Sequence, residues 1–277
     1  MAPPDGTRRL IVNADDFGKS HSVNQAVLEA HHRGILTTAS LMVNEPGFPE
    51  AVELARNNPR LGIGLHLTLS HGHSTLPAAQ IPALVNSAGE FPESPAMTGL
   101  RYYFRRDLRE SLAREIRAQF DKFYSTGLPL DHVNGHLHFH LHPTIFSILL
   151  EEHFRRPFKS MRFTREPFWL NARLAGGRWF YRSSHALIYR CLSSRARARL
   201  AARGIRHTQR VFGLLQNALV DESYILRLLP RLPTGDSELY SHPSLHEFKH
   251  EFEALISPRV LALVRELRIQ LIRYQDL

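Results

Sequence analysis

The sequence predicts an α/β fold, built as a single distorted or incomplete (β/α) barrel of the TIM type with mostly parallel strands. Apolar strand-like segments alternate with amphipathic helical segments at least four times, which is typical of parallel strands joined by crossover helices. A chain of 277 residues without an obvious Gly/Pro linker fits one α/β barrel. Acidic and histidine side chains also lie at the ends of several expected strands. We therefore expect one domain over residues 1–277, with a flexible leader over residues 1–8.

The expected strands are short apolar segments, several of them rich in β-branched residues. The first is apolar until it ends in two aspartates, and the second is the run ILTTASLMVN. The third, LGIGLHLTL, and the fourth, LDHVNGHLHFHLHP, carry histidines, and the later segments are less regular. The expected strands cover residues 9–16, 35–44, 61–69, 130–143, 160–167, 205–215 and 237–243.

Helical apolar spacing marks the segments between these strands. The first helix begins at Ser20, a favoured capping residue, and continues with apolar residues such as Val23 and Val27. Pro59 ends the second helix, and Gly127 follows the third. Residues 70–100 contain several Pro, Gly and Ser residues and are expected to form a long loop. The expected helices cover residues 20–34, 48–58, 107–127, 144–154, 184–203 and 258–274.

The composition excludes several classes of protein. A hydrophobic content of 43% and a charged content of 22% are typical of a soluble globular protein. The single cysteine, Cys191, excludes an internal disulfide framework and fits a reducing compartment. Residues 1–9 lack the apolar stretch of a signal peptide, and no segment is apolar over the length needed to span a bilayer. No G-x-G-x-x-G motif follows the first strand, which argues against a nucleotide site. We expect a cytoplasmic protein.

The net charge of +9 is concentrated late in the chain. Between Arg182 and Arg210 there are eight arginines and no acidic residue. Three interpretations remain open for this segment: a solvated helix face, a surface that contacts anionic lipid headgroups on the inner face of a membrane, or a nucleic-acid patch. The oligomeric state is also open, and a homo-oligomer is compatible with the sequence.

Polar residues at strand ends are the main functional signal, because α/β folds present their active residues at the carboxyl ends of strands. Asp15 and Asp16 end the first expected strand, Asn44 ends the second, and His66 lies in the third. Near the end of the chain, ELYSHPS places Glu238 and His242 at another strand end. Carboxylates and imidazoles from separate strands form the donor set of a divalent-metal site with a nearby base. The alternative for the first pair is a simple turn, since Asp and Gly are turn formers.

Four alternating histidines follow in the fourth strand: His136, His138, His140 and His142. In a strand they would share one face, at roughly 6.5–7 Å from one to the next. With metal–nitrogen bonds of about 2.0–2.1 Å, they could not all reach one ion. We therefore expect one or two of them to bind the metal and the others to contact substrate or pack.

These segments together resemble a known family. The motifs LIVNADDFG, TTASLMVN, GIGLHLTLSHG, DHVNGHLHFHLHP and ELYSHP are similar to successive motifs of the YdjC-like carbohydrate deacetylases, and most similar to the HpnK-type, hopanoid biosynthesis-associated branch. The resemblance extends from about Leu10 to the last helix. It implies a distorted barrel that removes the acetyl group from an N-acetylated amino sugar, with one divalent metal ion (Mg²⁺ or Zn²⁺, with Mn²⁺ as a further candidate). In the HpnK-type branch, the substrate would be an N-acetylglucosaminyl-hopanoid or a related glycolipid.

The resemblance also implies roles for individual residues. Asp16, His66 and His136 match the family's metal ligands. Asp15 would be the general base, and His242 the acid that protonates the leaving amine. The family often has Asp-Ser-His-His-His-x-His where this chain has Asn134-Gly135-His136-Leu137-His138-Phe139-His140. The change to Asn134 removes a carboxylate that could orient a ligand, and it makes His138 a rival of His136.

Further residues are candidates for substrate binding. The stronger candidates are Asn44, His138, His140, Arg162 and Glu238. Arg162 or Arg165 could instead orient the base or simply be solvated. The loop with His71 and His73 could line a sugar cleft, and Phe17, Phe139 and Trp169 could stack on a sugar ring or belong to the core.

Two other function classes stay open. A metal-dependent phosphoesterase or esterase would use the paired aspartates and the histidine run for two ions, so a count of bound metal separates it from a deacetylase. A basic nucleic-acid-binding protein would explain the arginines but not the carboxylate and histidine strand ends, and the arginines lack interleaved aromatics. We therefore expect no nucleic-acid partner.

Overall fold

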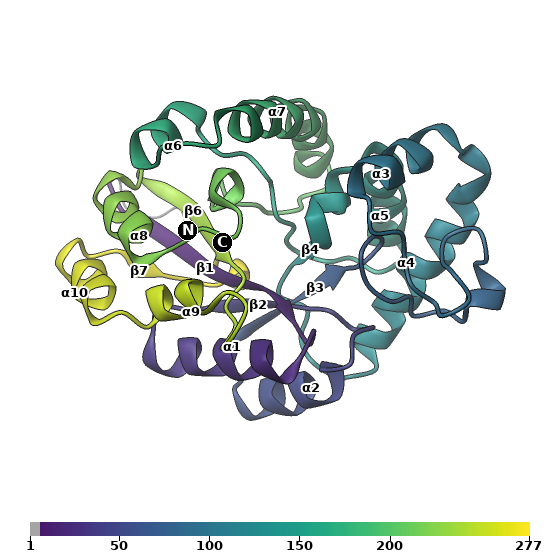
Figure 1. Cartoon of the computed structure of the whole chain (residues 1–277), viewed down its shortest axis with the longest axis horizontal. Helices are drawn as coiled ribbons and strands as arrows, with labels where there is room; N and C mark the ends of the chain where they lie inside the picture. The colour runs from purple at the N-terminus through teal and green to yellow at the C-terminus, as the bar shows by residue number, and fades with distance from the viewer. Residues whose placement is uncertain (1–5) are drawn as a thin grey trace.

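A curled parallel sheet lies at the centre of the protein, and helices pack around its outside (Figure 1). The computed structural model describes residues 6–277. Six strands form a half-barrel in the order β4-β3-β2-β1-β6-β5, and β7 pairs with β1. All seven strands pair in parallel. They are β1 (Arg8–Phe17), β2 (Thr38–Leu41), β3 (Gly62–Leu67), β4 (Val133–Gly135), β5 (Arg210–Phe212), β6 (Gly235–Ser241) and β7 (Gln270–Leu271). The incomplete parallel barrel is confirmed.

β1 is the central strand and is buried along almost its whole length. It pairs with β6 from Arg8 to Ala14, whereas β2 joins it only from Asn13 onward. The short β7 pairs with Arg9 and Leu10. The leader expected over residues 1–8 lies mostly outside the described residues, and Arg8 already belongs to β1.

The helices follow the apolar spacing of the sequence and place their buried faces on the sheet. The expected cap of the first helix is present, since Ser20 accepts a hydrogen bond from Val23 N. No helix among residues 6–277 has both the length and the apolar character needed to cross a bilayer. The helices are α1 (His21–Arg33), α2 (Phe48–Asn57), α3 (Pro95–Phe104), α4 (Arg109–Tyr124), α5 (Pro143–Arg155), α6 (Phe168–Leu174), α7 (Trp179–Ala201), α8 (Glu222–Leu228), α9 (Lys249–Leu255) and α10 (Pro258–Glu266).

Several expected elements differ from the structure. The strand expected over residues 130–143 ends at Gly135 and continues as a 3-10 turn, because Leu137 and His138 have positive φ. The loop expected over residues 70–100 includes the start of α3, and the helix expected over 258–274 ends at Glu266, before β7. The strand expected over residues 160–167 is reduced to isolated parallel bridges of Met161 to Val133 and of Ser160 to Arg206. Helices α6, α8 and α9 were not expected.

One helix directly supports the end of β3, where the site begins. The buried face of α4 repeats at Leu112, Ile116, Phe120 and Phe123. On the same face, the Gln119 amide accepts from Thr68 N at 3.0 Å and donates to Thr68 O at 2.7 Å. These bonds satisfy the backbone just after β3 and hold the segment that carries His66.

Candidate metal and catalytic site

The paired aspartates lie at the carboxyl end of β1, at a bulge. Ala14 pairs with Ala39, and the next pair is Phe17 with Leu41, so β1 has one extra residue between them. Asp16 has a φ of 64°, in the left-handed region. In a regular strand the two carboxylates would point to opposite faces, whereas the bulge turns both toward one imidazole, that of His66. His66 Nδ1 lies 3.9 Å from Asp15 Oδ1, and its Nε2 lies 3.3 Å from Asp16 Oδ1. The two interpretations of this pair, a polar strand end and a turn, therefore both apply, because the strand ends in the bulge.

Asp16, His66 and His136 form a compact group of potential metal ligands. One donor atom from each residue lies within 4.8 Å of the other two. His136 Nδ1 is 3.0 Å from Asp16 Oδ1, and the rings of His66 and His136 meet edge to face at 5.5 Å. Burial would raise the pKa of Asp16, but the charges and hydrogen bonds of the two imidazoles hold it well below its ordinary value. An ionised carboxylate and two imidazoles are a suitable donor set for a divalent cation.

The contacts of His66 determine which of its two ring nitrogens faces Asp16. Asn134 Nδ2 faces Asp15 Oδ1 at 3.2 Å and Ser40 Oγ at 2.8 Å, and an ionised carboxylate only accepts hydrogen bonds. Asn134 Oδ1 therefore faces His66 Nδ1, at 2.7 Å, and accepts its proton. This leaves His66 Nε2 directed to Asp16, and Nε2 is therefore the ring nitrogen that could bind a metal. Asn134 thus orients His66, which is the role expected of the aspartate often found at this position in the family.

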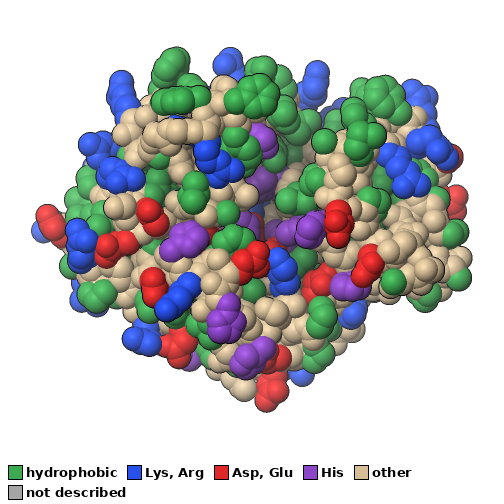
Figure 2. Space-filling view, viewed as in Figure 1, with side chains coloured by type: hydrophobic (Ala, Val, Ile, Leu, Met, Phe, Trp, Pro, Cys, Tyr) green, Lys and Arg blue, Asp and Glu red, His purple; other side chains and the backbone are tan. Residues whose placement is uncertain are grey.

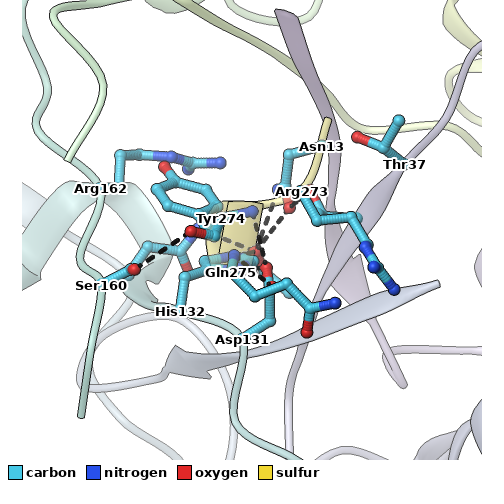
Figure 3. Close-up of polar contacts among 12 residues, drawn as sticks. Asn13, Thr37, Asp131, His132, Ser160, Arg162, Arg273, Tyr274 and Gln275 are labelled. Carbon is cyan, nitrogen blue, oxygen red and sulfur yellow. Dashed lines mark hydrogen bonds and ion pairs between the residues drawn. The ribbon is translucent and has the colours of Figure 1, made fainter. Parts of the chain in front are cut away.

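A fully buried chain of hydrogen bonds fixes Asn134 in turn. His132 Nδ1 lies 3.0 Å from Asp131 Oδ2, and His132 Nε2 lies 2.9 Å from Ser40 Oγ. Asp131 also accepts the backbone amides of Tyr274 and Gln275, as Figure 3 shows. Aspartate, histidine and serine in this order resemble a nucleophilic triad, but Ser40 and His132 are completely inaccessible. The chain therefore positions Asn134 and does not attack a substrate.

The histidine run does not form one face of a strand. Leu137 and His138 have φ values of 53° and 59°, so the four rings point in different directions. His138 Nε2 lies 3.0 Å from the Tyr240 hydroxyl, His140 Nε2 lies 3.2 Å from Arg162 O, and His142 Nε2 lies 3.0 Å from Gly99 O. The expected alternation was wrong, and His136, not its rival His138, joins Asp16.

His138 and His140 are buried close to the site. Burial, reinforced by the charge of Arg162, lowers the pKa of His138 well below its ordinary value and that of His140 to about 3. Both imidazoles are therefore neutral at physiological pH, and their Nδ1 atoms have no partner among the described residues. Substrate binding by these two residues remains a prediction.

Behind Asp15 lies a buried guanidinium. Arg162 Nη1 and Nη2 donate to Asp15 at 2.7 and 2.9 Å, and Arg162 Nε and Nη2 donate to Glu238 at 2.9 and 2.7 Å. Glu238 also accepts from the Tyr274 hydroxyl. Burial opposes the charge of Asp15, but Arg162 and then His66 hold its pKa well below the ordinary value. Arg162 and Glu238 have no exposed surface, so the structure places them beneath the site rather than on a substrate-facing wall.

His242 approaches from the end of β6 and has its own counter-ion. Glu251 Oε2 accepts from His242 N at 2.5 Å and lies 3.7 Å from Nδ1. Burial opposes the imidazolium, but the hydrogen bond and charge of Glu251, followed by the charges of Asp16 and Asp15, raise the pKa of His242 to about 9. His242 is therefore protonated at neutral pH. Glu251 was not foreseen, because it lies in α9, a helix that the sequence did not indicate.

A cavity of about 630 Å³ opens beside His136. His71, His73, Lys19 and Glu45 are among its lining residues, so the expected histidine loop lies at this cavity. Figure 2 shows histidine side chains in a hollow between two lobes of the surface. Lys19 Nζ is 3.3 Å from Asp16 Oδ2. Lys19 was not singled out from the sequence, and the only sequence signal for this contact is the spacing of three residues between Lys19 and Asp16.

The remaining candidates lie outside the centre of the site. Asn44 donates its amide to His73 O and so holds the loop at the cavity. Phe17 and Phe139 are buried in the core, whereas Arg165 and Trp169 are exposed. Sugar stacking by Phe17 or Phe139 is therefore not supported by their positions.

Comparison with known proteins identifies a family for this chain. The family model described as YdjC-like protein matches residues 9–266. A carbohydrate deacetylase from Geobacillus stearothermophilus is 42% identical over 161 residues, covering 57% of this chain and 62% of that protein. A chitooligosaccharide deacetylase from Serratia marcescens is 36% identical over 146 residues, covering 50% of this chain and 53% of that protein. The chain thus spans about three fifths or less of the length of these relatives.

A solved structure is similar over nearly the whole chain. The crystal structure of a candidate cellobiose-phosphate cleavage protein from Enterococcus faecalis V583 has a TM-score of 0.72 and 25% identity, and the match covers 98% of each chain. An uncharacterized protein from Agrobacterium tumefaciens C58 has a TM-score of 0.52 at 12% identity, which supports the fold alone.

Proposed function

This chain belongs to the YdjC-like protein family, and on that premise we propose that it is a metal-dependent hydrolase that removes the acetyl group from an N-acetylated amino sugar. The observation that carries the proposal is the group of Asp16, His66 and His136, with His66 Nε2 directed to Asp16 and Asp15 beside the ring. The relatives named carbohydrate deacetylase and chitooligosaccharide deacetylase support the choice of reaction.

The three ligand residues fit a divalent cation, with Mg²⁺, Zn²⁺ and Mn²⁺ as candidates. An ion held there supplies Lewis acidity, which polarises an acetyl carbonyl and lowers the pKa of a nearby water. Only one such group of ligands occurs among residues 6–277, which favours a one-ion site over the two-ion phosphoesterase alternative.

Two side chains would then handle protons on opposite sides of the acetamide. Asp15, ionised at neutral pH, accepts a proton as water adds to the acetyl carbon. His242, protonated at neutral pH, donates a proton to the nitrogen as the carbon–nitrogen bond breaks. The products are acetate and a free amino sugar. Arg162 keeps Asp15 in place through its two hydrogen bonds, and Glu251 keeps His242 charged.

The sugar would occupy the cavity beside His136, where His71, His73 and Glu45 offer polar contacts. For the substrate we propose an N-acetylglucosaminyl lipid of the hopanoid type, on the strength of the resemblance to the HpnK-type branch. Such a substrate would place the enzyme at the cytoplasmic face of a membrane.

The test is release of acetate by the full chain from N-acetylglucosaminyl lipid and from chitobiose, before and after chelation. We expect activity that disappears with chelator and returns with Zn²⁺, Mg²⁺ or Mn²⁺. The Asp16→Asn variant should lose both bound metal and activity. If the protein contains about one metal ion per chain and releases acetate from neither substrate, the proposed reaction is refuted.

A further inference from the structure

Helix α7 presents an apolar stripe to solvent. Phe180 is 87% exposed and Leu187 is 63% exposed. A residue seven positions on from another on a helix lies on the same face, and the exposed Cys191 continues the stripe one turn later. The neighbouring Trp169 on α6 and Trp179 at the start of α7 are also exposed. Isolated exposed apolar residues are ordinary, whereas a larger exposed apolar patch is typical of an interaction surface.

Arginines border this stripe on both sides. At about 100° per residue, Arg190 and Arg197 lie on one side of the line through Phe180 and Leu187, and Arg195 and Arg199 lie on the other. Among the described residues, none of these four arginines forms an ion pair with a carboxylate. The cationic rim is thus free to meet anions from outside the protein.

A second exposed apolar edge belongs to α3, on the other side of the hollow that leads to the site (Figure 2). Its large exposed side chains are Met97, Leu100, Tyr103 and Phe104. In Figure 1, α6, α7 and α3 lie along the same, upper side of the molecule. The inner face of α7 also reaches the site, because the Tyr189 ring contacts the His138 ring at 5.2 Å.

We propose that the α7 stripe, its arginine rim and the α3 edge form a docking surface for an anionic phospholipid membrane. An apolar helix face with Trp and Phe, bordered by arginines, has the composition of a helix that lies in a membrane interface. Lipid phosphates complement the arginines, whereas a second copy of this chain would bring the same positive charge and repel it. Docking does not depend on the deacetylase reaction. Docking would bring the cavity to a lipid-linked sugar, and this purpose rests on the proposed function.

The two tryptophans make the proposal directly testable, because Trp169 on α6 and Trp179 at the start of α7 are exposed next to the α7 stripe and the chain has no others. The full chain is mixed with neutral phosphatidylcholine vesicles or with vesicles that contain phosphatidylglycerol. We expect the tryptophan emission to shift to the blue and to be quenched by brominated lipid only with the anionic vesicles. We also expect binding to weaken with salt. No shift with anionic vesicles, or an equal shift with neutral ones, overturns the proposal.

Variants separate this surface from the rest of the protein. The double variant F180S/L187S should partition at least tenfold more weakly, because two large apolar groups no longer leave water. L271S, at an exposed leucine of β7, is the matched control and should bind like the parent. Asp16→Asn should bind vesicles normally, so a failure of catalysis and a failure of docking are distinguished. Equal weakening by L271S, or self-association of the chain without lipid, would each contradict membrane docking.

Discussion

Replacement of Arg162 by methionine removes the cation that holds two buried carboxylates. Arg162 donates two hydrogen bonds to Asp15, at 2.7 and 2.9 Å, and two to Glu238, at 2.9 and 2.7 Å, and none of these side chains is more than slightly exposed. Breaking a buried ion pair by removing one partner costs roughly 3–5 kcal/mol, because the remaining charge is left uncompensated. For a chain of this size that loss corresponds to a fall in Tm of roughly 6–20 °C.

The pH dependence is the sharper part of this prediction. In the parent protein the pKa of Asp15 lies below its ordinary value of 3.8, so the pair stabilises the fold above about pH 4 and the stabilisation is lost as pH falls. In R162M the largest remaining influence on Asp15 is burial, which raises its pKa above the unfolded value. The folded variant then takes up protons more readily than the unfolded chain, so its stability rises as pH falls from 8 toward 5. The gap in stability between parent and variant should therefore narrow over this range.

Urea unfolding of metal-free protein at pH 5, 6.5 and 8 measures the gap. Glu238→Gln is the matched control, since it keeps both bonds from Arg162 to Asp15 and should cost about 1–2 kcal/mol. The double variant R162M/E238Q has one fewer uncompensated carboxylate and should be more stable than R162M at pH 8. A gap that stays constant or widens toward pH 5 would refute the account of Arg162 as the counter-ion.

Three further outcomes follow from the site. Asn134→Leu removes the acceptor for His66 Nδ1 and should lower zinc affinity roughly 10- to 100-fold by calorimetry; unchanged affinity would contradict the orienting role. His136→Ala should abolish tight zinc binding whereas His138→Ala should retain it, and the reverse result would mean that the run folds differently around the ion. In a pH–rate profile, activity should decline above about pH 9, where His242 loses its proton; persistence of that decline in His242→Gln would assign it to another group.

The sequence pointed to the candidate site because active residues in a parallel sheet lie at the carboxyl ends of the strands. Asp15, Asp16, His66 and His242 were all identified from this rule, and the structure brings their elements to one end of the sheet. The fourth strand was less predictable. The alternating histidines are compatible with a strand, but Val133 is the only β-branched residue between positions 130 and 143. In the structure the backbone turns immediately after Gly135. Periodicity carries no information about such left-handed positions in residues other than glycine.

The roles proposed for the paired carboxylates depend on neighbouring residues that belong to no recognisable sequence motif. Asp15 and Asp16 are adjacent and chemically identical, yet Asp15 meets a guanidinium and two amides, from Asn13 and Asn134, while Asp16 meets two imidazoles. Arg162 comes from a segment that pairs only through isolated bridges, so nothing local in the sequence places it behind Asp15.

The same reasoning applies to the proposed acid and base. Burial disfavours the charge of both Asp15 and His242, and one counter-ion contributes most to reversing this for each: Arg162 helps to keep Asp15 ionised, and Glu251 helps to keep His242 protonated. Environments that shift the pKa values of two groups in opposite directions in this way produce a proton acceptor and a proton donor at the same pH. The cost is that Asp15 is a weak base, which is efficient only toward a strongly acidified water. An ordinary water would not yield its proton to such a carboxylate, so the proposed chemistry requires the ligand group beside Asp15, and activity without bound metal would be incompatible with it.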